Sequence, residues 1–148
     1  MNNLRILIVD DERDMLVLLQ RIITEETEHE VVTEHNPYQA LKRFKKDPFD
    51  LVITDLKMPK MDGITLLQKI KALDPTAAVV VMTAFGTIET AVEAIKTGAA
   101  DYITKPFHLA ELNSRVNSLL RRRKFEGNNN IIFGEIEIDP VAKIALVN

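Results

Sequence analysis

Carboxylate, hydroxyl and ammonium side chains lie where the short apolar runs of this chain end. These positions are Asp10-Asp11, Asp55, Thr83 and Lys105. Grouped carboxylates repel one another, and a hard divalent cation such as Mg²⁺, which prefers oxygen ligands, relieves that repulsion. Mg²⁺, a hydroxyl and an ammonium group together could neutralise the three equatorial oxygens of a phosphoryl group. Because a carboxylate is also an established phosphoryl acceptor, the set indicates phosphoryl chemistry.

Each of these residues alone has a plain structural explanation. An acidic pair before a helix is commonly a cap, and Asp55, Thr83 or the Lys105-Pro106 pair could each start a turn or loop. Their joint occurrence, each at the end of its own apolar run, favours one common site over several unrelated turns.

The apolar runs have the length of strands and alternate with stretches of helical period. The runs lie at 6–9, 31–32, 51–53, 78–82 and 102–103. The helical stretches carry Met15, Leu18, Leu19 and Ile22; Tyr38, Leu41 and Phe44; Leu66, Leu67, Ile70 and Leu73; Ile88, Ala91, Val92 and Ile95; and Leu109, Leu112, Val116, Leu119 and Leu120. Asn36, before a proline, and Thr87 are predicted N-caps, and Gly98 is a predicted helix end.

The strand runs are continuous rather than alternating in polarity, which indicates burial on both faces. Helical crossovers between such strands imply a parallel sheet with helices on each side. The sequence therefore predicts an α/β, doubly wound, five-stranded fold. Function in these sheets lies beyond the carboxyl ends of the strands, so we expect the polar residues to meet at one edge.

Composition narrows the function classes further. The net charge is −3 and the pI about 5.6, which gives no electrostatic footprint for nucleic acid or an anionic membrane. The absence of Cys excludes disulfides, thiolate chemistry and Cys-type zinc sites, and the three histidines have no ligand spacing. No apolar run approaches the roughly 20 residues that span a bilayer, and no signal peptide is visible. We therefore expect a cytoplasmic protein without membrane contact.

Four motifs resemble those of the receiver domain of two-component response regulators. They are Val9-Asp10-Asp11-Glu12, the run 55–63 (DLKMPKMDG), Met82-Thr83-Ala84 and the run 98–107 (GAADYITKPF). The resemblance implies a flavodoxin-like sheet of strand order 2-1-3-4-5. It also implies that the chain takes a phosphoryl group from a phosphohistidine of a sensor histidine kinase. Such a chain is a switch with at most slow self-dephosphorylation, not an enzyme.

The resemblance assigns chemical roles to the matching residues. Asp55 would be the phosphoacceptor. Asp11, Asp55 and the backbone carbonyl of Lys57 would bind Mg²⁺, and Asp10 would contact the ion through water. Lys105 would pair with the phosphoryl group.

The resemblance also implies a switch. Phosphorylation of Asp55 adds about −1.5 to −2 charge, and Thr83 would move to hydrogen-bond the new group. Tyr102 would then turn inward into the space that Thr83 leaves. Ala91 and Ala94 on the following helix suit a surface that slides, although plain close packing on the sheet explains them equally.

The chain changes character after the receiver-like part. We assign residues 1–121 to a receiver, 122–130 to a polar linker, and 131–148 to a β-hairpin or the truncated start of an output domain. The tail resembles the opening strands of a winged-helix DNA-binding domain, whereas 83–107 is closer to receivers that precede a σ54-type ATPase domain. We favour the winged-helix start and expect DNA contact only through an output domain. A stand-alone receiver and a homodimer formed on phosphorylation are further candidates.

Two enzyme or cofactor alternatives fit less well. Aspartate-nucleophile phosphatases carry a second Asp two residues after the nucleophile, where this chain has Lys57 after Asp55 and Glu12 after Asp10. A flavin or nucleotide module would need a Gly-rich phosphate loop after the first strand, where this chain has acidic residues.

Overall fold

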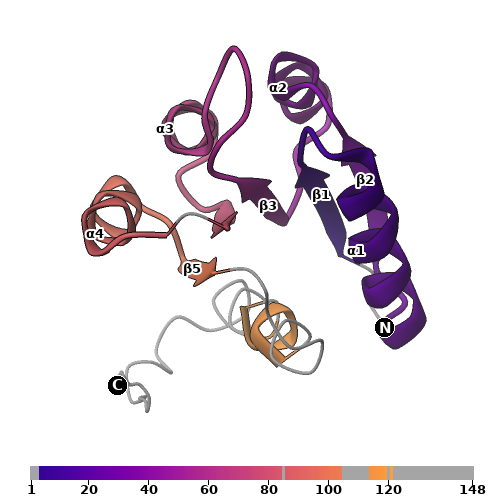
Figure 1. Ribbon diagram of the computed structural model, residues 1–148. Helices are drawn as coiled ribbons and strands as arrows, with labels where there is room; N and C mark the ends of the chain where they lie inside the picture. The colour runs from indigo at the N-terminus through magenta and orange to yellow at the C-terminus, as the bar shows by residue number, and fades with distance from the viewer. Residues whose placement is uncertain (1–3, 85, 105–113, 120, 122–148) are drawn as a thin grey trace.

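Strands and helices alternate along the computed structural model, which describes residues 4–84, 86–104, 114–119 and 121 (Figure 1). The elements are β1 (Arg5–Val9), α1 (Arg13–Glu26), β2 (Glu30–Glu34), α2 (Pro37–Lys46), β3 (Leu51–Asp55), α3 (Gly63–Leu73), β4 (Ala78–Thr83), α4 (Ile88–Thr97) and β5 (Asp101–Thr104). Residues 114–119 are also helical. The predicted linker at 122–130 and the predicted hairpin at 131–148 lie outside the described residues, as do Leu109, Leu112 and Leu120 of the last predicted helix.

The sheet has the order β2-β1-β3-β4-β5, and every neighbouring pair is parallel. This confirms the predicted doubly wound, flavodoxin-like topology. Because the strand order reverses beside β1, the carboxyl ends of β1 and β3 flank a topological switch point, where such sheets bind ligands. Val9 is in register with Thr54. The residues that follow them, Asp10 and Asp55, therefore lie side by side.

Alternate strand residues build two separate cores. Leu7 and Val9 of β1 belong to one apolar cluster, which α2, α3 and α4 cover. Ile6 and Ile8 belong to the other, which α1 and the helical residues 114–119 cover. Figure 1 shows these two helical layers on opposite sides of the sheet. Burial on both faces explains the continuous apolar runs.

The predicted helix ends agree with the structure. The Asn36 side chain accepts the backbone N–H of Tyr38 at 2.9 Å before the first turn of α2. Thr87 and Thr90 form a reciprocal capping box at the start of α4. Gly98 ends α4 with a φ of 119°, a left-handed conformation that favours glycine.

The apolar spacing that predicts α4 does not identify its buried side. Ile88, Val92 and Ile95 are 80%, 44% and 51% exposed, whereas Ala94 is fully buried against the first core. The helix thus contacts the sheet through a small side chain, which permits close approach of its backbone. Its branched residues form an exposed apolar stripe.

A polar network ties the amino ends of the strands together, at the edge opposite the strand ends that carry the aspartates. The Arg5 guanidinium lies 4.2 Å from the Phe49 ring centroid and forms ion pairs with Glu30 and Asp47. His29 accepts the backbone N–H of Leu4 on Nδ1 at 3.1 Å. The neutral imidazole is needed there, because a protonated ring has no acceptor nitrogen.

Replacing His29 with Asn should reduce the loss of stability in mild acid. Burial lowers the pKa of His29 below its ordinary value of 6.5, against the opposing effect of the Asp50 and Glu28 carboxylates. A histidine with a lowered folded-state pKa contributes stability that is present above the unfolded pKa and declines as the pH falls through about 6.5 towards the folded pKa. Asn keeps an acceptor for the Leu4 N–H and does not titrate. Between about pH 7.5 and 5.5, the free energy of unfolding measured with urea should therefore decline more in the parent than in His29→Asn. Equal declines in the two proteins would contradict this account.

Candidate functional site

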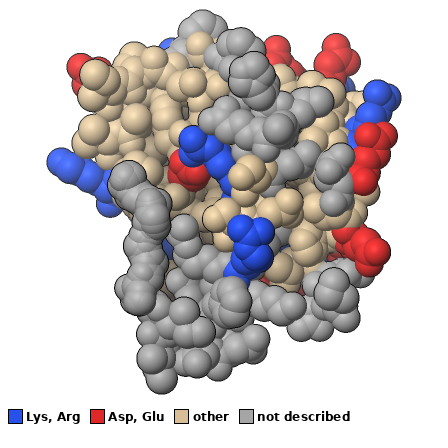
Figure 2. All heavy atoms as spheres, turned by 90° about the horizontal axis from the view of Figure 1, so that it is seen from below, with Lys and Arg blue, Asp and Glu red and all other residues tan. Residues whose placement is uncertain are grey.

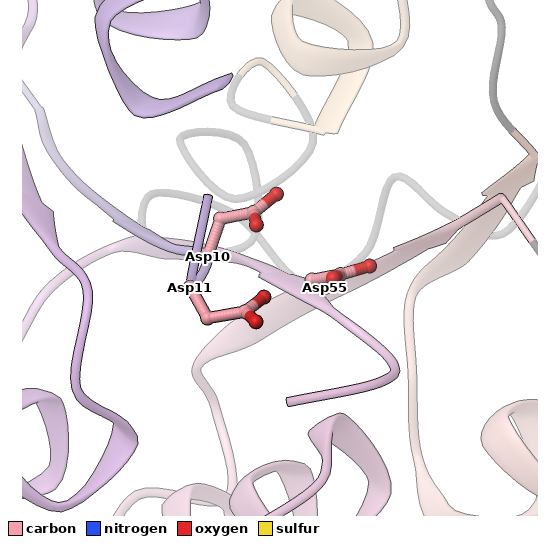
Figure 3. Close-up of side chains that lie close together, drawn as sticks. All are labelled: Asp10, Asp11 and Asp55. Carbon is pink, nitrogen blue, oxygen red and sulfur yellow. The ribbon is translucent and has the colours of Figure 1, made fainter. Parts of the chain in front are cut away.

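The carboxylates of Asp10, Asp11 and Asp55 converge at the carboxyl ends of β1 and β3 (Figure 3). One oxygen from each residue lies within 4.8 Å of the others. Figure 3 shows the side chains entering the same space, two from the end of β1 and one from the end of β3. The structure thus brings Asp55 next to the Asp10-Asp11 pair, from which more than forty positions separate it in the sequence.

The burial of this cluster makes its charge costly. Asp10 is fully buried and Asp55 is 8% exposed, whereas Asp11 is exposed. Ionised carboxylates this close repel one another, and burial adds a desolvation cost. A small divalent cation would offset both costs, and a set of oxygen donors with one open side suits Mg²⁺.

The Asp10 carboxylate is oriented by the chain that follows it. Its Oδ1 accepts the backbone N–H of Glu12 at 2.9 Å. The N-cap of α1 is Glu12, and no side chain caps this helix. The alternative in which Asp10-Asp11 simply caps the first helix is therefore wrong for α1.

The Asp55 carboxylate is held by the backbone on its own strand end. Oδ1 accepts the N–H of Leu56 at 3.0 Å, and the Thr54 hydroxyl donates to the Asp55 carbonyl at 2.9 Å. The N–H of Gly63 donates to the Leu56 carbonyl at 2.8 Å. A Cβ on Gly63 would overlap the Asp55 carbonyl oxygen. Only glycine lets the start of α3 approach the acceptor strand this closely.

The loop between β3 and α3 is anchored by buried methionines. Met58 and Met61 both pack into the first core. Between them the Met61 N–H donates to the Pro59 carbonyl at 2.8 Å, and Lys60 has a φ of 76°. This is a tight three-residue turn with a non-glycine residue in the left-handed region, which costs backbone strain. The backbone of Lys57 is thereby held between Asp55 and a fixed turn.

Thr83 and Tyr102 lie on the neighbouring strands. Thr83 is fully buried at the end of β4, one position beyond Met82, the register partner of Asp55. Tyr102 is half-buried on β5 and packs against the first core. Its hydroxyl lies 2.7 Å from the Thr90 hydroxyl on α4.

Lys105 follows β5 in the sequence but lies outside the described residues. Its pairing with a phosphoryl group stays a prediction from the sequence. The described site therefore consists of the acidic cluster, the β3–α3 loop, Thr83 and Tyr102.

Comparison with known families decides how this site is interpreted. Residues 6–117 match the family described as the response regulator receiver domain. The chain belongs to this family. The receiver resemblance in the sequence motifs is thereby confirmed, and the fold agrees with it strand by strand.

The receiver is similar to transcriptional regulators. It is 40% identical over 119 residues to the transcriptional regulatory protein ZraR of Escherichia coli (strain K12), which covers 80% of this chain and 27% of ZraR. It is 35% identical over 147 residues to the transcriptional regulatory protein PrrA of Mycobacterium tuberculosis, which covers 97% of this chain and 63% of PrrA. The chain thus spans less than two thirds of either relative.

A solved receiver has the same fold. The beryllofluoride-activated NtrC4 receiver domain dimer superimposes with a TM-score of 0.76 at 32% identity, covering 80% of this chain and 98% of that one.

The outer surface adds two observations. On the coloured part of the face seen in Figure 2, blue and red side chains are interspersed, without an extended patch of one charge. Within the described ranges, no helix is both long and apolar enough to cross a membrane.

Sequence reasoning missed three residues near this site. Gly63 was only part of a motif, and Gly86 and Thr90 were not singled out. Thr90 had a signal, because threonines three positions apart at a helix start can form a capping box. The contacts of the glycines had no sequence signal, since they depend on backbone from other strands.

Replacing Gly63 with Ala should destabilise the receiver by about 1–3 kcal/mol, the usual cost of an overpacked contact. The same change in an open helix position normally stabilises, because Ala is the better helix former. The clash with the Asp55 carbonyl should also reduce the stabilisation that Mg²⁺ gives. Urea unfolding with and without Mg²⁺ measures both effects. Gln68→Ala, at an exposed position of the same helix, is the control. A stabilised Gly63→Ala protein with a full response to Mg²⁺ would disprove the contact.

Proposed function

We propose that this receiver accepts a phosphoryl group on Asp55 from a phosphohistidine of a sensor histidine kinase, with Mg²⁺, and thereby controls a transcriptional output. The observation that carries the proposal is the convergence of Asp10, Asp11 and Asp55 within 4.8 Å at the switch point of a receiver sheet. The relatives ZraR and PrrA are transcriptional regulatory proteins, which supports such an output and a cytoplasmic place of action.

The proposed Mg²⁺ ligands are Asp11, Asp55 and the backbone carbonyl of Lys57, with Asp10 acting through water. The ion, when bound, supplies positive charge to the phosphoryl oxygens. The donor set fits because it consists of oxygens only and two of its carboxylates are buried. The strained turn after Lys57 and the Gly63 contact hold the carbonyl and the acceptor strand in place.

In the proposed transfer, a carboxylate oxygen of Asp55 attacks the phosphorus of the phosphohistidine. The O–P bond forms as the N–P bond breaks, and the bonding pair returns to the imidazole nitrogen, which takes up a proton. The Leu56 N–H fixes the rotation of the Asp55 carboxylate through Oδ1. Lys105 would pair with the transferred group. Slow hydrolysis of the acyl phosphate would then reset the chain.

The proposed switch runs through Thr83 and Tyr102. Thr83 lies at the same strand edge as Asp55, so its hydroxyl is suited to meet a new anionic group there. A Cβ on Gly86, in the loop after β4, would contact both Thr83 and Tyr102, so Gly86 lies near both residues. A displacement of that loop would therefore change the surroundings of the Tyr102 side chain.

The segment 131–148 would belong to the output rather than to the receiver. The match to PrrA spans 147 residues, whereas the match to ZraR spans 119. A similarity that continues beyond the receiver supports assigning the tail to the output. DNA contact would depend on that output.

Self-association would use the exposed stripe of α4, formed by Ile88, Val92 and Ile95. The exposed charges beside it are Glu89, Glu93 and Lys96. Of these, Glu89 and Lys96, near opposite ends of the helix, are complementary when two copies of α4 pack antiparallel. The similar NtrC4 receiver was solved as an activated dimer, which supports this assembly.

Asp55→Asn should abolish phosphorylation. Incubation with a small phosphodonor and Mg²⁺ should add one phosphoryl group to the parent, and intact-mass measurement should show it lost on treatment with base. Asp14→Asn, at an exposed carboxylate outside the cluster, is the matched control and should behave as the parent. Omission of Mg²⁺ should prevent the modification.

Two results would overturn this function. One is modification that persists in Asp55→Asn. The other is repeated turnover of a phosphomonoester by the parent, which would make the chain a phosphatase.

Thr83→Ala should leave phosphorylation largely intact but weaken its conformational effect, because it removes one hydrogen bond, worth about 1 kcal/mol. NMR shift changes on phosphorylation, read at the loop after β4 and at α4, should be smaller in the variant. Thr24→Ala, on the exposed side of α1, is the control. Equal shift changes in Thr83→Ala and the parent would reject this role.

Val92→Glu should prevent self-association of the phosphorylated chain, because it places a charge in the centre of the stripe. Size-exclusion chromatography with light scattering measures the assembly. Val17→Glu, at an exposed valine of α1, should leave it unchanged. A phosphorylated dimer that survives Val92→Glu would place the interface elsewhere.

A further inference from the structure

The shortest link between α4 and β5 is a pair of hydroxyl groups. Thr90 Oγ1 lies 2.7 Å from Tyr102 Oη, in a part-buried position. That separation is the usual one for a good O–H···O hydrogen bond. The other described threonine hydroxyl contacts on α4 are within the helix or its cap, so this bond fixes the tyrosine to a different element.

The same Thr90 oxygen also closes the capping box of α4. It accepts the N–H of Thr87 at 3.1 Å and lies 3.1 Å from the Thr87 carbonyl, to which it is placed to donate. A hydroxyl has one proton and two acceptor sites. When that proton goes to the Thr87 carbonyl, Tyr102 is the donor to Thr90. The tyrosine and the helix cap thus share one oxygen.

Gly86 brings this bond next to Thr83. A Cβ on Gly86 would lie 2.7 Å from Thr104 Cγ2, 3.2 Å from Tyr102 Oη and 3.5 Å from Thr83 Cγ2. A side chain at position 86 would therefore contact the tyrosine hydroxyl and the threonine methyl, and glycine leaves this space open. A movement of Thr83 towards Asp55 would therefore take place close to the Thr90–Tyr102 bond.

We propose that Thr90 is the positioning residue of the switch: its hydroxyl holds Tyr102 in the orientation seen here and couples that orientation to the first turn of α4. The inference rests on the proposed function for its role in signalling. The bond itself joins two residues of the chain and can be tested without phosphorylation. Loss of one net hydrogen bond should shift the tyrosine equilibrium away from this orientation by about fivefold.

The first experiment compares Thr90→Val with Thr90→Ser by NMR of ring-labelled tyrosine. The chain has two tyrosines, and Tyr38 is exposed on α2, so it is an internal reference. Without phosphate, Thr90→Val should move the Tyr102 resonances and leave those of Tyr38 unchanged. Thr90→Ser keeps the hydroxyl and should restore the parent spectrum. Unchanged Tyr102 resonances in Thr90→Val would overturn the proposal.

The second experiment separates the coupling from damage to the helix cap. Tyr102→Phe removes the same bond but leaves both threonines in place. It should increase amide hydrogen exchange in the first turn of α4, and the double variant with Thr90→Val should be less destabilised than the sum of the two single variants. Additive effects on stability, together with unchanged amide hydrogen exchange in Tyr102→Phe, would overturn the coupling. The exchange measurement on Tyr102→Phe applies even if Thr90→Val folds poorly.

Intact mass after treatment with a phosphodonor distinguishes this proposal from the proposed function. Thr90→Val should gain the phosphoryl group as the parent does, with a smaller change in the Tyr102 signal on phosphorylation. A parent that gains no phosphoryl group would refute the proposed function but not the bond. A modified parent whose Tyr102 signal responds identically in Thr90→Val would refute the role of Thr90.

Discussion

Mutual repulsion among Asp10, Asp11 and Asp55 is the constraint on which the rest of this structure depends. The fold holds three carboxylates within 4.8 Å, two of them buried, at the carboxyl ends of adjacent strands. Like charges so placed destabilise the native state unless a cation or a proton offsets them. In the proposed function, this close set of oxygen donors would hold Mg²⁺ and, with it, receive a phosphoryl group.

The surrounding structure holds the three carboxylates in this arrangement. Strands buried on both faces cannot twist their ends apart without opening two apolar cores. Gly63 allows the start of α3 to lie close to the Asp55 carbonyl. The buried side chains of Met58 and Met61 anchor the loop that carries Lys57. The strain at Lys60 is tolerated because both sides of the turn are anchored. Rigid support on this side contrasts with α4, which meets the core through the small Ala94.

The helices on the two sides of the site thus differ in how much apolar surface they bury. A helix that buries small side chains has less apolar contact to lose when it moves, and its branched residues remain available to a partner. The hydroxyl pair of Thr90 and Tyr102 adds a specific polar contact to this lightly packed helix. In the proposed switch, Thr83, Gly86 and Tyr102 would connect the charge at the strand edge with the position of α4.

The sequence by itself determined the order of the strands and helices, the two layers, the helix ends at Asn36, Thr87 and Gly98, and the residues that compose the acidic cluster. These follow from local rules: apolar period, cap chemistry and the meeting of parallel strand ends at one edge. Tertiary structure alone decided which side of α4 is buried, because apolar spacing marks a helix but not what packs against it. It also decided the glycine contacts at Gly63 and Gly86 and the bond from Thr90 to Tyr102. Those contacts depend on the distances between elements that are far apart in the chain. The packing of all the elements between them sets these distances, so no single stretch of residues predicts them.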